Sequence, residues 1–127
     1  MAATRLTTAK LIKPLGGAII RRYTSGAAIA AGECVYMAST GYISPCNTTS
    51  AAMESIGIAV QAAAGAAERL DVVVHGPVLC MSGATIGATV FNHTNAGEFS
   101  ESGSNFNTAL GWAETAAILF VQPEHLA

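Results

Sequence analysis

The stretch Ser25–Met37, SGAAIAAGECVYM, is the key to the organisation of the chain, because a second version of it occurs at Ser82–Asn92, SGATIGATVFN. Serine, glycine, alanine, isoleucine, glycine, valine and an aromatic residue recur in the same order. The match continues downstream, where Ile56–Ala59 (IGIA) corresponds to Leu110–Ala113 (LGWA). Self-similarity of this kind indicates a repeated structural unit. We therefore predict two related units, at about residues 25–80 and 82–123.

Each unit has the residue pattern of β-structure. Cys34–Met37 is a short run of β-branched and aromatic residues, and Gly41 supplies the positive φ of a hairpin that returns through Tyr42–Ser44. Leu70–Val74 contains three consecutive valines, and Ala117–Val121 is its counterpart in the second unit. We expect the proline that follows each of these runs to end the strand.

A single unit of this size would leave a hydrophobic face and open strand edges, so the two units are expected to pair. The predicted fold class is all-β, a small β-barrel or sandwich built from the internal repeat. At 127 residues the chain suits one domain. We divide it into a basic, extended N-terminal arm at residues 1–24 and a single β domain at residues 25–127.

Charge is separated along the chain. Five of the six basic residues lie within the first 22 positions and all eight acidic residues follow, so the leader carries about +5 and the body +1 − 8 = −7. This separation favours an arm that lies across an acidic neighbouring surface. The alternative is a segment that packs on its own acidic body. The basic residues of the leader are Arg5, Lys10, Lys13, Arg21 and Arg22.

The composition argues against several partner classes. A net charge of −2 predicts no nucleic-acid partner. Residues 72–97 carry no formal charge, but Gly76-Pro77 and other turn residues interrupt the run, so we expect no membrane span. The leader lacks the apolar run of an export signal. Charged residues make up only 11% of the chain, and we therefore expect partner chains to cover much of the surface.

The histidines do not form a catalytic or metal-binding pattern. His75, His93 and His125 lie at a strand end, in a polar loop and in the tail, without acidic or thiol neighbours at ligand spacing. Asp71 is the only aspartate, and on one strand it would lie roughly 13 Å from His75, too far for a hydrogen bond. We expect a protein that is not an enzyme and that binds no cofactor or metal.

The three cysteines are Cys34, Cys46 and Cys80. Their odd number and their spacing argue against a secreted disulfide framework and against a zinc site. If the hairpin turns at Thr40, Cys34 and Cys46 lie opposite one another, and a cross-strand disulfide is geometrically conceivable. The alternative is three reduced, small apolar residues in a protein made in a cytoplasm.

Trp112 is the only tryptophan. It is either a core filler or an anchor at a protein interface, where large aromatic side chains are favoured. We place Trp112 and Phe120 as candidates for contact between subunits.

These residues together carry a resemblance to a known family. The pattern consists of Ile29–Tyr36 (IAAGECVY), a hairpin at Gly41–Ile43, Ile56–Ala59, and a valine-rich strand ending in Gly76–Val78. It resembles the small β-rich head decoration (cement) proteins of tailed bacteriophages, directly over about residues 25–80 and through the internal repeat beyond them.

The resemblance implies a structural virion protein on the outer surface of the phage head, made in the host cytoplasm. Its implied partners are the major capsid protein, whose subunits it would staple together, and itself, as a homotrimer. We assign capsid contact to the five basic residues of the leader and subunit contact to Trp112 and Phe120. One alternative is a neck, tail or head-fibre adaptor. Another is a carbohydrate-binding β-sandwich for host adhesion, which would need a cluster of exposed aromatic side chains.

Overall fold

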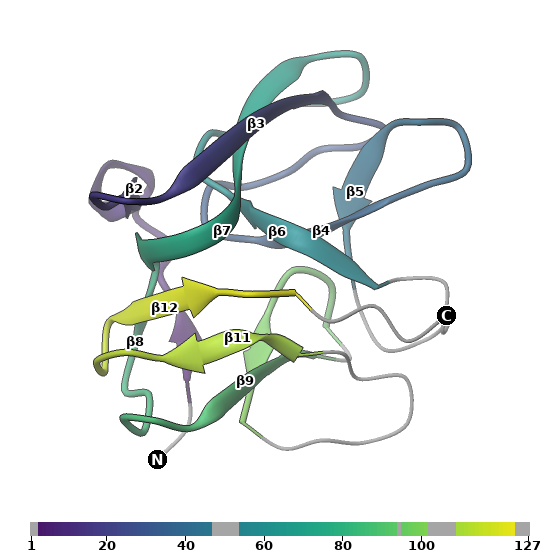
Figure 1. The fold of residues 1–127 in the computed structure, drawn as a ribbon. Helices are drawn as coiled ribbons and strands as arrows, with labels where there is room; N and C mark the ends of the chain where they lie inside the picture. Colours follow the sequence, from purple (N-terminus) through teal and green to yellow (C-terminus); the bar gives the residue numbers. More distant parts are fainter. Residues whose placement is uncertain (1–2, 47–53, 94, 102–108, 124–127) are drawn as a thin grey trace.

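The structure, a computed structural model, describes residues 3–46, 54–93, 95–101 and 109–123 (Figure 1). The described chain is all-β, as the sequence predicted, and its one helical element is a short 3-10 turn. The elements are β1 (Thr4–Arg5), η1 (Ala9–Leu11), β2 (Lys13–Pro14), β3 (Ile19–Thr24), β4 (Cys34–Met37), β5 (Ile43–Pro45), β6 (Ser55–Ala59), β7 (Arg69–Leu79), β8 (Met81–Ser82), β9 (Thr89–Asn92), β10 (Phe99–Ser100), β11 (Ala109–Ala113) and β12 (Ile118–Val121).

One large sheet curls into a half-barrel, with strand order β10-β9-β11-β12-β7-β6-β4-β5 (Figure 1). Strand β7 is the longest, at 11 residues, and it joins the two halves of the sheet. Its first part lies between β3 and β6, and its last part between β2 and β12. The short pair β1-β8 forms a separate two-stranded sheet.

The two halves of the large sheet share one pairing order. Strands run β5-β4-β6-β7 in the first half and β10-β9-β11-β12 in the second, with antiparallel neighbours throughout. Each half has a register shift at the same place, beside Gly57 in β6 and beside Gly111 in β11. A Cβ at Gly57 would overlap the carbonyl oxygen of Val73, and one at Gly111 would overlap that of Phe120. Both positions therefore require glycine, while duplication as the origin of the two halves stays a prediction.

The predicted hairpin of the first unit is confirmed. β4 pairs with β5 in antiparallel register, with Met37 opposite Ile43. Gly41 has a φ of 87°, and its N–H donates to the carbonyl oxygen of Ala38. The turn thus uses the left-handed conformation that glycine adopts without a steric penalty.

The expectation that proline ends the valine-rich strand is wrong for Pro77. β7 runs past Pro77 to Leu79, and Phe120 of β12 lies opposite Pro77 in register. The carbonyl oxygen of Pro77 accepts a hydrogen bond from the N–H of Leu15 at 3.0 Å. Proline lacks only the donor of a peptide unit, so the strand continues through the acceptor that remains.

The separate N-terminal arm is not confirmed. Described residues 3–24 belong to the β-structure of the body: β1 pairs with β8, and β2 and β3 pair with β7. Ala3 and Ile12 are buried in the main hydrophobic core. Charge attraction alone would allow the leader to bind either an acidic surface of its own body or that of a neighbouring chain. Strand pairing with β7 places the leader on its own body.

The core lies inside the curl and has two parts. The larger part packs side chains from both halves, including Ile58, Val78, Leu110 and Leu119. The smaller part lies under β3 and the start of β7, where it contains Leu70 and other residues of the first half. Burial of these aliphatic side chains stabilises the fold, at about 25 cal/mol per Å² of apolar surface.

The two ends of the strand order meet at Gly97, just before β10. Its N–H donates to the carbonyl oxygen of Cys46 at 2.8 Å, and its carbonyl oxygen accepts from the N–H of Cys34 at 3.4 Å. These bonds link the second half of the sheet to the β4-β5 hairpin of the first half.

Candidate functional site

Four basic residues of the leader form an exposed group, which we call the basic edge. They lie on η1, β2 and β3, along one side of β7. Strand β3 is the outer strand here, since among the described residues it pairs only with β7. The members of the basic edge are Lys10, Lys13, Arg21 and Arg22.

Arg22 is the one member of the basic edge with an ion pair in the described part of the chain. Its Nε lies 3.1 Å from Oδ1 of Asp71, which is directly opposite it on β7. Its side chain is 54% exposed, so this contact is screened by water and contributes little, about 0–1 kcal/mol. The charge of the basic edge therefore remains available to a partner surface.

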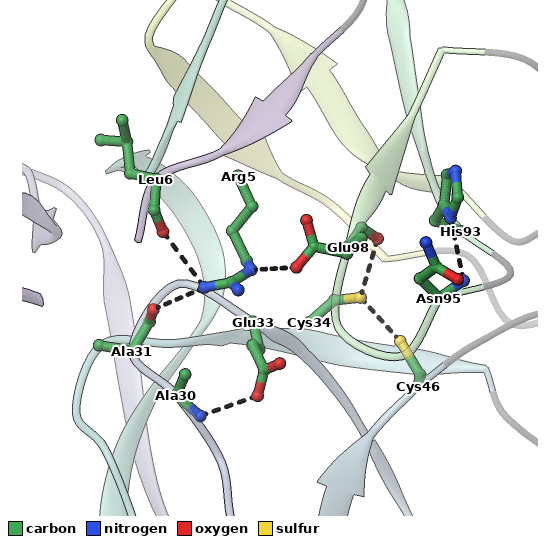
Figure 2. A network of polar contacts seen from close by, with 10 residues as sticks. All are labelled: Arg5, Leu6, Ala30, Ala31, Glu33, Cys34, Cys46, His93, Asn95 and Glu98. Atoms are coloured by element: carbon green, nitrogen blue, oxygen red, sulfur yellow. Dashed lines mark hydrogen bonds and ion pairs between the residues drawn. The ribbon is translucent and has the colours of Figure 1, made fainter. Parts of the chain in front are cut away.

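Arg5 lies elsewhere and faces inward. Its Nε lies 2.7 Å from Oε2 of Glu98, and Nη1 donates to the carbonyl oxygens of Leu6 and Ala31 (Figure 2). The side chain is only 11% exposed. Arg5 was predicted to contact a partner together with the other basic residues, but the structure separates it from them and gives it internal partners.

Trp112 and Phe120, both predicted to contact another subunit, lie side by side on the outer face of the sheet. They are opposite one another in the β11-β12 register, and their rings stack at a centroid distance of 5.3 Å. The rings of His75 in β7 and Phe120 form a T-shaped contact at a centroid distance of 5.2 Å. Ile19 of β3 lies opposite His75 in register. We call Ile19, His75, Phe120 and Trp112 the outer row.

The outer row follows from strand alternation. In β12, Leu119 and Val121 are buried, whereas Ile118 and Phe120, which alternate with them, are half-buried. Successive residues of a strand point to opposite faces, so the aromatic residue of β12 is directed away from the core. The ends of the row are well exposed, with Ile19 at 54% and Trp112 at 39%.

Sequence reasoning missed Ile19 and His75 as members of this surface. The useful signal was the period of two in 118–121, which places Phe120 on the outer face. No local pattern places β3 beside β7, because the two strands are about 50 positions apart in the sequence.

A buried polar junction lies where the two halves of the sheet meet (Figure 2). The Sγ atoms of Cys34 and Cys46 are 2.9 Å apart, and both residues are fully buried free cysteines. Cys34 Sγ also lies 3.8 Å from the carbonyl oxygen of Glu98. Burial, followed by the contact with Cys46, raises the pKa of the Cys34 thiol well above its ordinary value. Cys34 is therefore a protonated thiol at neutral pH.

A small cleft lies beside this junction. It has a volume of about 270 Å³ and is lined by Ala3, Thr4, His93, Asn95, Glu98 and Phe99. Nδ1 of His93 accepts a hydrogen bond from the N–H of Asn95 at 2.9 Å, which fixes the imidazole in its own loop.

Across residues 3–46, 54–93, 95–101 and 109–123, no three His, Cys, Asp or Glu side chains gather into a metal-binding group. His125 lies outside these residues. No helix within them has the length and apolar character needed to cross a membrane.

Comparison with known proteins gives one family. Residues 14–76, which extend from the end of β2 through most of β7, match the model of the family described as phage cement protein. No curated protein and no solved structure matches the chain. The matched segment contains the hairpin, the glycine bulge of β6 and the valine-rich strand that carried the resemblance in the sequence. The chain thus belongs, through this segment, to the phage cement protein family.

Proposed function

We propose that this protein is a capsid decoration protein, which binds the outer surface of a phage head and stabilises the contacts between major capsid protein subunits. The observation that carries the proposal is the family match over residues 14–76. A cement protein acts by burying surface against its neighbours, so the relevant features are its exposed surfaces and not a catalytic centre.

The basic edge is proposed to contact the capsid. Lys10, Lys13 and Arg21 are exposed, and no ion pair within the described residues occupies them. An acidic patch on the capsid would complement this charge, which favours fast association and a fixed orientation. Arg5, with its internal partners, is excluded from this contact in our proposal.

The outer row is proposed to join copies of the protein into a homotrimer. Aromatic side chains contribute disproportionately to protein interfaces when a partner excludes water from them. Trp112 and Phe120 already stack on one another, so binding would cost little side-chain entropy. A trimer would attach to the head through three basic edges at once, which raises its avidity.

Capsid binding is tested with phage heads that lack this protein. Co-sedimentation should show saturable binding of the wild type, weakened by salt because the contact is electrostatic. Replacing Lys10, Lys13 and Arg21 with Glu should weaken binding at least about tenfold. The matched control is Arg69→Glu, an exposed basic residue outside the basic edge, which should bind normally. Equal binding by the triple variant and the control would refute the contact.

Stabilisation is tested on the same particles. Heads with bound protein should withstand heating that opens undecorated heads, as followed by release of their DNA. Electron microscopy then locates the bound protein. Density over the whole head supports decoration, whereas density confined to the neck or tail would instead assign the protein to the adaptor class.

Self-association is tested by light scattering. The wild type should have the mass of three chains, and Trp112→Ala should shift it towards the monomer. The matched control is Tyr42→Ala, which removes an aromatic ring of similar exposure from the β4-β5 hairpin. If Trp112→Ala leaves the mass unchanged, the outer row does not form the interface between copies.

The exposed aromatic pair also bears on the carbohydrate-binding alternative. A sugar site would need a cluster of exposed aromatic side chains. Of this pair only Trp112 is well exposed, at 39%, so we do not propose a sugar site.

A further inference from the structure

The two cysteines of the polar junction are positioned to react with one another. Cys34 begins β4, and Cys46 directly follows β5, the antiparallel partner of β4. The N–H of Cys46 donates to the carbonyl oxygen of Cys34 at 3.1 Å, so the two residues are cross-strand neighbours. Their Sγ atoms are 2.9 Å apart, against about 2.05 Å in a disulfide. Only a small movement separates this thiol pair from a covalent bond.

We propose that Cys34 and Cys46 are an oxidisable dithiol, which forms an intramolecular disulfide when the protein moves from a reducing to an oxidising environment. The oxidant is a small disulfide such as oxidised glutathione. A thiolate of the pair attacks it, forms a mixed disulfide and expels one small thiolate, which takes up a proton. The second cysteine, as thiolate, then attacks the mixed disulfide and expels the other. Two protein thiols and one small disulfide thus become one protein disulfide and two small thiols.

Cys46 is the residue that the oxidant reaches first. It follows β5, which has three residues and lies at the end of the strand order. Short edge strands open locally at low cost, and such opening exposes Cys46 without unfolding the core. Cys34 lies inside, between the two halves of the sheet, and is therefore the resolving thiol.

The disulfide would strengthen the place where the curled sheet closes. The backbone of Gly97 bonds to both cysteines, and Glu98 next to it holds Arg5. A bond between Cys34 and Cys46 would hold β5 against β4. It would thereby fix the carbonyl oxygen of Cys46 and the N–H of Cys34, with which Gly97 forms its two hydrogen bonds. Oxidation would then stabilise the connection of the β4-β5 hairpin to the second half. This inference does not depend on capsid binding.

Cys80 supplies an internal control. It is buried and free like the other two, and its N–H donates to the carbonyl oxygen of Ala117, just before β12. The structure gives it no sulfur partner among the described residues, so it should stay reduced.

The test treats the full chain with oxidised glutathione, alongside a sample kept in a phosphine reductant, in urea below the unfolding transition so that the edge strand can open. Intact mass should fall by about 2 Da on oxidation, and peptide mapping should join Cys34 to Cys46 and leave Cys80 alkylatable. The oxidised protein should melt roughly 10 °C higher, as expected for a link across 12 positions.

Two variants make the result specific. Cys80→Ala should keep both the link and the shift in melting temperature, whereas Cys46→Ala should lose both while remaining folded. The proposal is overturned by a stable mixed disulfide with glutathione, by a link that involves Cys80 or a second chain, or by thiols that stay free in urea. A link that forms without raising the melting temperature would overturn its stabilising role.

Discussion

The Nε atom of Arg5 lies 2.7 Å from Oε2 of Glu98, and this contact joins two residues 93 positions apart. It attaches the first strand of the chain to the loop that closes the curled sheet. We expect Arg5→Ala to lower the free energy of unfolding by about 1–3 kcal/mol, because it removes a charge-assisted bond and leaves a half-buried carboxylate without its partner. Urea unfolding measures the loss.

The matched control for this prediction is Arg22→Ala, which breaks the exposed pair with Asp71. That change should cost less than about 1 kcal/mol, since water screens the contact. Equal costs for the two variants would contradict the structural role of Arg5.

The close approach at Gly57 and Gly111 gives a second prediction. Gly57→Ala and Gly111→Ala should each destabilise the protein by more than about 4 kcal/mol, because the added Cβ overlaps a carbonyl oxygen of the next strand. Gly65→Ala is the control, since nothing lies within 4 Å of its Cβ position. Circular dichroism during thermal unfolding separates the variants. A folded Gly111→Ala protein with normal stability would show that the bulge is adaptable.

The leader is expected to be required for folding. Deleting residues 1–24 removes β1, β2 and β3, along with the buried side chains of Ala3 and Ile12, and uncovers one side of β7. The shortened chain should aggregate or remain unfolded by circular dichroism and light scattering. A chain in which only Lys10, Lys13 and Arg21 are changed to Gln should fold normally. A deletion variant that is folded and monomeric would show that residues 1–24 are a separate arm, as the sequence predicts.

Buried thiols make the reduced protein sensitive to alkaline pH. Burial raises the pKa of the Cys34 thiol, with Cys46 adding to the effect, and burial likewise raises the pKa of Cys80 above its ordinary value of 9.0. The unfolded chain releases these protons above about pH 9 while the folded protein keeps them, so stability is full below that pH and falls as pH rises. Above that pH, the thiols of Cys34 and Cys80 should each contribute a slope that approaches about 1.4 kcal/mol per pH unit.

Urea unfolding between about pH 8.5 and 9.5, in a phosphine reductant, measures this slope before most tyrosine and lysine side chains titrate. Cys80→Ala should reduce the slope of the unfolding free energy against pH by the contribution of one thiol. An unchanged slope in that variant would mean that Cys80 titrates alike in the folded and unfolded states.

Much of the fold was predictable from local pattern. The hairpin of β4 and β5 follows from a β-rich run, a glycine turn and a second run within 12 positions. The strands β7 and β12 follow from their branched side chains, and the alternation in β12 places Phe120 outside. The polar junction was partly predictable, because the hairpin register alone places Cys34 opposite Cys46.

The all-β class and the hairpin follow from the sequence alone, because they depend on residues close together in the chain and on the geometry of single strands. Only the tertiary structure decided that the leader pairs with β7, that Arg5 turns inward to Glu98, and that Ile19 and His75 join Trp112 and Phe120 in the outer row. The physical reason is that attraction between opposite charges acts alike within a chain and between chains. Strand pairing and burial, which join residues about 50 to 93 positions apart, determine which of these charges find partners within the chain.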